Sequence, residues 1–268
     1  MKRFTKIYLI ALSLVIGNAI TANAQADSDE LANKLQNPLA KIIALPIQHN
    51  ISMGSPSYEG AMYTMSLQPI IATEYDKFNI IHRGVINLSY LPTTADGNGN
   101  TPALGDFNYS FFMAPKKTGK VAWGVGPSVD LPTATEPMLG SGKWSVGAGA
   151  VLVYQTKKIT LDVVVRQTTS IAGDADRDNV NRFVAQTLFA YGLGNGWVVN
   201  TFPTITANWN AEKGQQWTVP VGGGVSKLTF LGGKLPLNMG VQYYHNAVRP
   251  DYAPKGELRF LTTFVFGK

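Results

Sequence analysis

The stretch from Trp197 to Trp209, WVVNTFPTITANW, restricts the possible fold more than any other part of the chain. Every second residue from Trp197 to Trp209 is largely apolar, whereas the residues between them are mostly polar. Because successive side chains of a strand point to opposite faces, this alternation predicts a β-strand. Tilted by about 40°, such a strand spans roughly 30 Å, the height of an outer-membrane apolar band with an aromatic girdle at each edge. The stretch therefore predicts a membrane-crossing strand.

The first part of the chain, 1–24, has the features of a secretory signal peptide. Three basic residues precede an apolar run over 7–16, and Ala22 and Ala24 form an A-x-A cleavage site. The apolar run is too short to be a membrane-spanning helix. We expect cleavage before Gln25, which removes three positive and no negative charges, so that the formal net charge changes from +6 to +3.

The remainder shows no linker, low-complexity run or compositional break, which favours one continuous domain. The absence of cysteine excludes a disulfide framework and a lipoprotein anchor. An N-terminal segment, 25–40, contains a short amphipathic helix expected near 29–36, with Ser28 as its N-cap and Pro38 as its stop. This helix could plug a lumen, lie on the membrane surface or form a solvated leader. The barrel itself is expected over 41–268.

Alternating segments separated by turn signals follow this N-terminal segment. We predict about twelve strands, at 41–53, 62–74, 78–91, 104–114, 120–131, 143–155, 159–171, 181–192, 197–209, 216–229, 234–246 and 257–267. The connections alternate between tight turns such as TKK and loops about twice as long, such as PTATEPMLGSG. This pattern predicts an all-β, transmembrane, antiparallel up-and-down barrel with short periplasmic turns, long extracellular loops and both ends in the periplasm.

The two faces of the predicted strands differ in chemistry. The polar face gives these candidate lumen-lining residues: Gln48, Gln68, Arg83, Asn87, Asp106, Asn108, Asp130, Asp162, Arg166, Arg182, Gln186, Asn200, Asn208, Asn238, Gln242 and Arg259. The apolar face gives these candidate girdle aromatics: Tyr63, Tyr90, Phe107, Tyr109, Trp123, Trp197, Trp209, Trp217, Phe264 and Phe266. A soluble sandwich would bury the apolar face instead. The inward charges could orient a polar solute, or they could pair with one another and fill a closed barrel.

Some residues fit this scheme poorly. Several prolines fall inside predicted strands, where each removes a hydrogen-bond donor, and they are expected at bulges or strand ends: Pro46, Pro69, Pro127, Pro203, Pro220 and Pro236. The three histidines, His49, His82 and His245, fall on the predicted lipid face. A serine hydrolase would need a histidine base on the same side as its nucleophile, so we expect no enzymatic activity.

Two other motifs carry little functional signal. The DADRDN sequence at 174–179 has alternating carboxylates but lacks the glycine and the final acid of a calcium loop, so we expect a solvated extracellular loop and no metal site. The GVGPS and VGGGVS sequences are not followed by a helix with the lysine of a phosphate loop. We expect no cofactor and no nucleic-acid partner.

Three stretches resemble a known group of proteins: LANKLQNPLAKIIALPIQHN, GVGPSVDLPTATEPMLGSGKWSVGAGAVLVYQ and NTFPTITANWNA. The chain resembles bacterial outer-membrane proteins described as neuromedin U-like or as transporters, which are similar to the meta-pathway phenol-degradation barrel family. The resemblance covers nearly the whole chain after the leader. It implies an outer-membrane barrel that passes small, aromatic or apolar molecules. One departure is that Phe266 is followed by Gly267 and Lys268, whereas many such barrels end on an aromatic residue.

These observations favour a monomeric channel in the outer membrane of a Gram-negative bacterium, exported by its signal peptide, that passes a small solute by diffusion through a polar lumen. Its expected partners are outer-membrane lipid and lipopolysaccharide, the outer-membrane assembly machinery and the solute. The alternative is a structural or interaction barrel with a closed lumen and functional extracellular loops.

Overall fold

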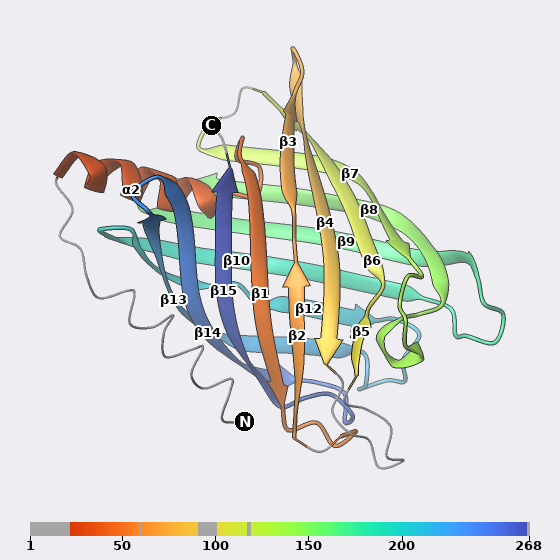
Figure 1. Cartoon of the computed structure of the whole chain (residues 1–268). Helices are drawn as coiled ribbons and strands as arrows, with labels where there is room; N and C mark the ends of the chain where they lie inside the picture. Colours follow the sequence, from red (N-terminus) through yellow and green to blue (C-terminus); the bar gives the residue numbers. More distant parts are fainter. Residues whose placement is uncertain (1–21, 59, 91–100, 117–118, 267–268) are drawn as a thin grey trace.

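The protein is a closed antiparallel β-barrel with one α-helix near its N-terminus (Figure 1). The computed structural model describes residues 22–58, 60–90, 101–116 and 119–266. The predicted signal peptide lies outside the described residues except for 22–24. The strands pair antiparallel in chain order, apart from segments of interrupted strands, and β15 (Gly256–Phe266) pairs with β1 (Ile43–Met53) to close the wall. The blue β15 and the orange β1 lie side by side in Figure 1.

The first half of the wall continues with β2 (Ala61–Leu67), β3 (Ile70–Glu74), β4 (Phe78–Tyr90), β5 (Pro102–Leu104), β6 (Phe107–Pro115), β7 (Val121–Leu131) and β8 (Lys143–Gln155). The second half contains β9 (Ile159–Gly173), β10 (Asn181–Gly194), β11 (Trp197–Thr201), β12 (Thr204–Asn208), β13 (Trp217–Leu231) and β14 (Leu235–Val248). A short 3-10 helix, η1 (Pro137–Leu139), lies between β7 and β8.

Twelve barrel strands form this wall. The described residues contain fifteen strand segments. Three consecutive pairs, β2 with β3, β5 with β6 and β11 with β12, each form one interrupted barrel strand, which leaves twelve. This result confirms the predicted all-β barrel of about twelve strands.

The predicted strand 197–209 is interrupted at Phe202 and Pro203, so its expected continuity is wrong. The interruption does not shift the register, because Phe189 pairs with Thr201 before it and Gln186 pairs with Thr204 after it. Side chains therefore keep their faces across the gap. Proline cannot donate a backbone hydrogen bond, which explains why the ladder opens at this point.

The other strand prolines also lie where the ladder is irregular. Pro69 lies in the gap between β2 and β3, and Pro46 of β1 lies opposite that gap. Pro127 lies where the pairing of β6 with β7 lapses between 110 and 113 of β6. Pro220 follows the register shift in β13, and Pro236 is the second residue of β14. These positions agree with the expectation that the prolines mark bulges or strand ends.

The helix α2 (Ala22–Leu35) is longer than the predicted helix at 29–36. Ser28 lies inside it, so the assignment of Ser28 as N-cap is wrong, and α2 also runs through the predicted cleavage site before Gln25. The preceding alanine-rich residues, ANAQAD, have enough helix propensity to extend it. The expected stop holds, because α2 ends at Leu35 and Pro38 lies in the following turn. No helix in the described part of the chain is long and apolar enough to span a membrane.

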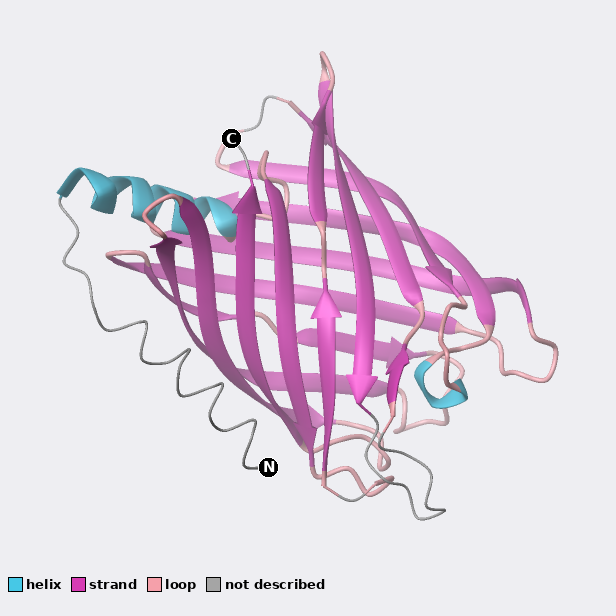
Figure 2. Cartoon of the chain, in the orientation of Figure 1, coloured by secondary structure: helices cyan, strands magenta, loops and turns pink. Residues whose placement is uncertain are grey.

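The two ends of the barrel differ in their connections (Figure 2). At one end, called here the turn end, short turns at 75–77, 156–158, 195–196 and 232–234 join the strands. At the opposite end, called here the loop end, the connections include 132–142, 174–180, 209–216 and 249–255. The predicted alternation of turn and loop lengths is therefore confirmed. The helix α2 lies at the turn end, whereas η1 belongs to the loop end.

Candidate functional site

The outer face of the barrel is apolar and its inner face is largely polar. On the outer face, the side chains of Trp123 and Leu152 are 49% and 51% exposed. On the inner face, Asn200 is 4% exposed and Ser128 is 0% exposed. A water-soluble sheet protein would reverse this arrangement, because burial of apolar area stabilises folding in water. The barrel therefore encloses a space, called here the lumen, whose lining includes buried polar side chains.

The candidate lumen residues fall into two main groups. Eight of them line a cavity near the middle of the lumen: Gln48, Gln68, Arg83, Asp162, Gln186, Asn200, Asn238 and Gln242. Four others form a hydrogen-bonded cluster toward the loop end, called here the Asp130 cluster: Asn108, Asp130, Arg166 and Arg182. Arg259 stabilises an interrupted strand, as described below. Asn87 lies in β4, where it pairs with Ser66 of β2.

Asp106 and Asn208 lie outside these two groups, at the loop end of the wall. Asp106 lies in the gap between β5 and β6, where its carboxylate accepts hydrogen bonds from the backbone N–H (2.7 Å) and the hydroxyl (2.8 Å) of Ser141. It therefore fastens the loop 132–142. Asn208 is exposed at the end of β12, and its side-chain oxygen accepts a hydrogen bond from the N–H of Asn210. Asn208 pairs with Arg182 and therefore shares its inward face at the end of the strand, whereas Asp106 lies in a gap, where strand alternation does not apply.

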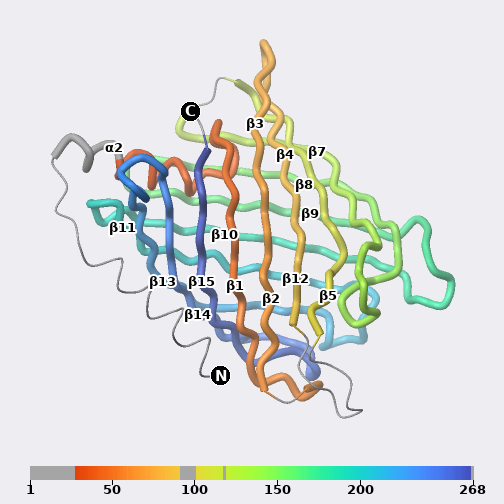
Figure 3. Tube along the Cα trace, viewed as in Figure 1, coloured from red at the N-terminus to blue at the C-terminus, as the bar shows by residue number. Residues whose placement is uncertain are grey.

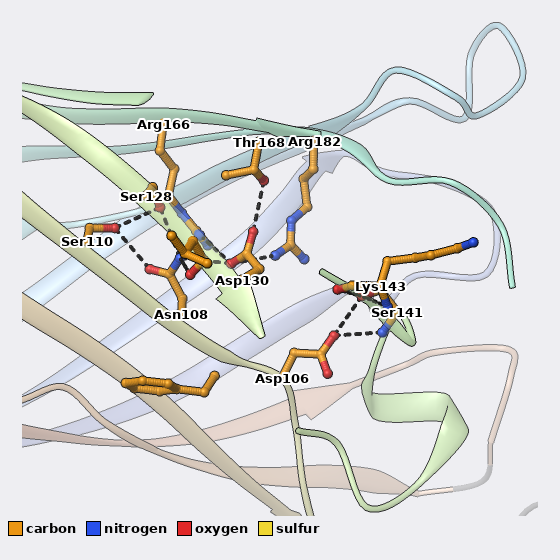
Figure 4. Close-up of polar contacts among 12 residues, drawn as sticks. Asp106, Asn108, Ser110, Ser128, Asp130, Ser141, Lys143, Arg166, Thr168 and Arg182 are labelled. Atoms are coloured by element: carbon orange, nitrogen blue, oxygen red, sulfur yellow. Dashed lines mark hydrogen bonds and ion pairs between the residues drawn. The ribbon is translucent and has the colours of Figure 1, made fainter. Parts of the chain in front are cut away.

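Asp130 is the centre of the Asp130 cluster (Figure 4). Its Oδ1 accepts hydrogen bonds from Nη1 of Arg166 and from Nδ2 of Asn108, both at 2.8 Å, and Nη2 of Arg182 lies 3.7 Å away. Its Oδ2 accepts a hydrogen bond of 2.9 Å from the hydroxyl of Thr168. These charges are paired inside the wall, which is the arrangement that stabilises buried carboxylates.

The interruption between β11 and β12 places Phe202 against the cavity. Its backbone N–H, which has no strand partner, donates a hydrogen bond of 2.7 Å to the Tyr244 hydroxyl. Its carbonyl accepts a hydrogen bond of 2.9 Å from Nη1 of Arg259, and that guanidinium also donates to Glu257 and lies over the Tyr244 ring. Two lumen side chains thus replace the lost ladder bonds, and they hold the gap in one conformation.

The central cavity has a volume of about 130 Å³. Apolar side chains toward the turn end form part of its lining, among them Ile81, Phe112, Val164 and Leu188. The amides listed above, two charged side chains and residues 35–38 of the N-terminal segment also line it. Nη2 of Arg83 donates a hydrogen bond of 2.8 Å to Oε1 of Gln68. Oδ1 of Asp162 is buried and has no hydrogen-bond partner among the described residues.

The N-terminal segment closes the turn end of the lumen. The helix α2 packs against β10, β11 and β13, and Leu39 is buried in an apolar cluster with Phe112 and Val153. Nδ2 of Asn33 donates to the carbonyl of Thr156 (2.7 Å), and Nδ2 of Asn37 donates to Oε1 of Gln155 (3.1 Å). Of the three placements considered for the predicted helix, the structure shows the one that plugs the barrel. Figure 3 shows the chain running from α2 directly into β1.

The apolar half of the lumen was not predicted from strand alternation. A usable signal was present in LDVVVR, where Val163, Val164 and Val165 are consecutive, so this part of β9 is apolar on both faces. A strand that is apolar on both faces is buried on both, which requires something apolar inside the barrel. Leu39 and the apolar residues of α2 meet that requirement.

The candidate girdle aromatics divide between the two ends. Near the loop end, Trp209 packs edge-on against Trp217, with Phe183 close by, and together they cover Ala207. Toward the turn end, the Trp197 ring receives the Lys227 ammonium at 4.9 Å, and Phe264 stacks with Phe266. Other members lie along the outer face at Tyr63, Tyr90, Phe107, Tyr109 and Trp123.

The histidines lie beside tyrosines or at the surface. His49 is hydrogen-bonded to the Tyr63 hydroxyl (2.5 Å) and His82 to the Tyr109 hydroxyl (2.7 Å), whereas His245 is exposed. In the 174–179 loop, Oδ1 of Asp174 accepts the N–H of Asp176. No group of acidic and histidine side chains that could hold a metal ion occurs within the described ranges.

Comparison with known proteins identifies the fold. No family model matches the chain, and no curated protein matches its sequence. Among solved structures, the COG4313 outer membrane channel from Pseudomonas putida F1 matches with a TM-score of 0.59 and 16% identity, over 84% of this chain and 94% of that chain. The NanC porin matches with a TM-score of 0.52 and 11% identity, over 84% of this chain and 100% of that chain. The chain therefore shares the barrel fold of outer-membrane channels.

Proposed function

We propose that this protein is a monomeric channel in the outer membrane of a Gram-negative bacterium, and that it passes a small solute through its lumen by diffusion. The solute has a polar group and an apolar or aromatic body, as the resemblance to the phenol-degradation barrels implies; the comparisons give no support to the neuromedin U-like label. The protein has no catalytic role in this proposal. Its leader directs export, and lipid, lipopolysaccharide and the assembly machinery are its partners in the membrane.

One observation carries the proposal: the barrel exposes large apolar side chains on the outside and encloses buried amides and charges on the inside. An apolar outer band is stable against acyl chains, and the closed ladder leaves no strand edge in lipid. A polar interior with a central cavity lets a solute exchange its hydration shell for protein hydrogen bonds. The outer-membrane channels that share this fold support the same reading.

The route has two parts. A solute entering from the loop end passes the Asp130 cluster and reaches the central cavity, which residues 35–38 of the N-terminal segment line. To leave at the turn end, it must displace the N-terminal segment. Asn33 and Asn37 hold that segment through hydrogen bonds to the turn that joins β8 and β9. Release of the plug breaks these bonds and the apolar contacts of Leu39 but leaves the strand ladder intact, so the plug can move without unfolding of the wall.

Conductance across a planar bilayer tests this function. Purified, heat-modifiable protein is expected to give discrete conductance steps. Alanine at both Asn33 and Asn37 should raise the open fraction by about tenfold, because two hydrogen bonds to the closed state are lost. Asn210→Ala, which removes a hydrogen bond to the Asn179 carbonyl at the loop end, is the matched control and should not change it.

A second candidate is a structural or interaction barrel whose loops do the work. The plug favours this second candidate. The loop 132–142 also favours it, because two residues from outside the loop fasten it: Asp106 accepts a hydrogen bond from Ser141, and Arg177 donates one of 2.8 Å to the Pro137 carbonyl. A folded protein that gives no conductance, either as wild type or with both asparagines replaced, would support this candidate and refute the channel.

A further inference from the structure

The central cavity holds two charges of opposite sign that are not paired with each other. Arg83 extends from β4 and Asp162 from β9, and both line the cavity. The ion pairs among the described residues join other groups, and none of them includes Arg83 or Asp162. Asp162 is 7% exposed, and its Oδ1 has no hydrogen-bond partner in the described part of the protein.

This arrangement differs from that of the other inward charges. Asp130 accepts hydrogen bonds from Arg166, Asn108 and Thr168, and Arg259 donates to Glu257. A buried carboxylate is unfavourable unless charge or hydrogen bonds compensate it. The wall supplies that compensation in the Asp130 cluster, whereas Oδ1 of Asp162 receives no hydrogen bond from the described residues. Buried groups left in this state are frequent at binding sites, where a ligand completes them.

The remaining lining defines the body of the ligand. One side of the cavity is apolar, with Ile81, Phe112, Val164, Leu188 and Phe202. Since a water needs about 10–15 Å³ of such space, a cavity of about 130 Å³ admits a molecule of roughly ten non-hydrogen atoms. The amides of Gln186 and Asn200 border the same space, and they can accept or donate hydrogen bonds.

We propose that the cavity is a binding site for a small zwitterion with an apolar or aromatic body, whose acidic group binds Arg83 and whose ammonium group binds Asp162. The inference rests on the proposed function, because the ligand enters through the lumen. Arg83 and Asp162 together contribute no net charge to the cavity, so a simple anion would meet Asp162 and a simple cation would meet Arg83. Only a molecule with both charges satisfies both groups.

Three compounds with the same aromatic skeleton test this proposal: phenylalanine, 3-phenylpropionate and phenethylamine. Isothermal titration of the folded, full-length protein in detergent is expected to show saturable binding of phenylalanine. The two singly charged compounds should bind about tenfold more weakly or worse, because each loses one charge-assisted hydrogen bond. This comparison uses the wild-type protein, so it does not depend on the folding of any variant.

Two neutral replacements extend the test. Asp162→Asn should weaken phenylalanine binding by about tenfold and make 3-phenylpropionate the better of the two charged compounds, whereas Arg83→Gln should favour phenethylamine. Asp176→Asn, at an exposed loop position, is the control and should leave the order unchanged. Each variant is first checked for the heat-modifiable gel shift of a folded barrel.

Equal affinities for the three compounds, or no saturable binding of any, would overturn the zwitterion site. Unaltered binding in Asp162→Asn would also overturn it. Conductance measured on the same preparation distinguishes failure of the binding site from failure of the channel. Discrete conductance steps without selective binding of phenylalanine would support the channel and refute the zwitterion site. Selective binding of phenylalanine without conductance would support the site and refute the channel.

Discussion

The loop-end half and the turn-end half of the lumen use the same inward side of the strands in opposite ways. In the loop-end half, the Asp130 cluster is polar; its hydrogen bonds join β6, β7 and β9, and an ion pair adds β10. In the turn-end half, inward residues such as Phe112 and Val153 are apolar, and Leu39 of the N-terminal segment packs against them. The polarity of each part of the inner face therefore matches the groups that lie against it. In the loop-end half the charged side chains of the wall pair with one another, whereas in the turn-end half the wall packs against the N-terminal segment.

The largest expected effect is in the loop-end half, from Asp130→Ala. This change leaves Arg166 without its carboxylate inside the wall and removes the acceptor of Thr168. Breaking such a buried pair should lower the free energy of unfolding by about 3–5 kcal/mol. Urea unfolding in lipid vesicles measures the change, with Asp176→Ala at an exposed loop position as the control. A loss no larger than that of the control would mean that the cluster does not stabilise the wall.

A smaller effect on stability, combined with a change in conductance, is expected in the turn-end half from Leu39→Ala. Truncation of a buried leucine costs about 2–5 kcal/mol, and the cost should fall mainly on docking of the N-terminal segment and not on the wall. Amide hydrogen exchange should therefore increase over 33–42 while the strands stay protected, and the channel should open more often. Uniformly faster exchange in the wall would contradict this division between plug and wall.

Tyr244→Phe tests the junction between the halves and should have a weaker effect. It removes the hydroxyl that accepts the Phe202 N–H and retains the ring under Arg259. One buried N–H left without a partner should lower the free energy of unfolding by about 1–2 kcal/mol. The same vesicle unfolding assay measures it. No change in stability would show that the gap between β11 and β12 does not need this bond.

The smallest effect is expected from Lys41→Ala at the outer rim of the turn end. Lys41 and Glu74 form an ion pair of 2.9 Å, but both side chains are well exposed. Solvent screens such pairs and their formation restricts flexible side chains, so stability should not change measurably. A loss comparable to that of Asp130→Ala would contradict the distinction between buried and exposed charge pairs.

Much of the fold could be predicted from the sequence because barrel strands alternate strictly. Trp197 and Val199 lie on the exposed outer face and Asn200 is buried on the inner face, and the turn and loop lengths alternate as expected. The gap at Phe202 could not be located, since a proline predicts an irregularity but not its form. It depends on Tyr244 and Arg259, which are distant in sequence.

The candidate site was less accessible to prediction. Alternation identifies Asp130 and Asp162 alike as inward, but only the structure distinguishes a carboxylate with partners from one without. The length of α2 was underestimated because Ser28 is a favourable capping residue, and the preceding helix propensity outweighed that local signal. Closure by Leu39 depends on tertiary contacts that no local pattern encodes.

The central claim is that the apolar face of each strand meets lipid and the polar face meets the lumen. Val199 and Asn200 are adjacent in β11, yet they are 39% and 4% exposed. The chain contains no cysteine, so Val199→Cys and Asn200→Cys each provide a unique site for a nitroxide label in vesicles. The label at 199 should collide with lipid-soluble oxygen far more often than with a water-soluble nickel chelate, and the label at 200 should not. Equal oxygen collision at both positions, or the reverse order, would contradict the account.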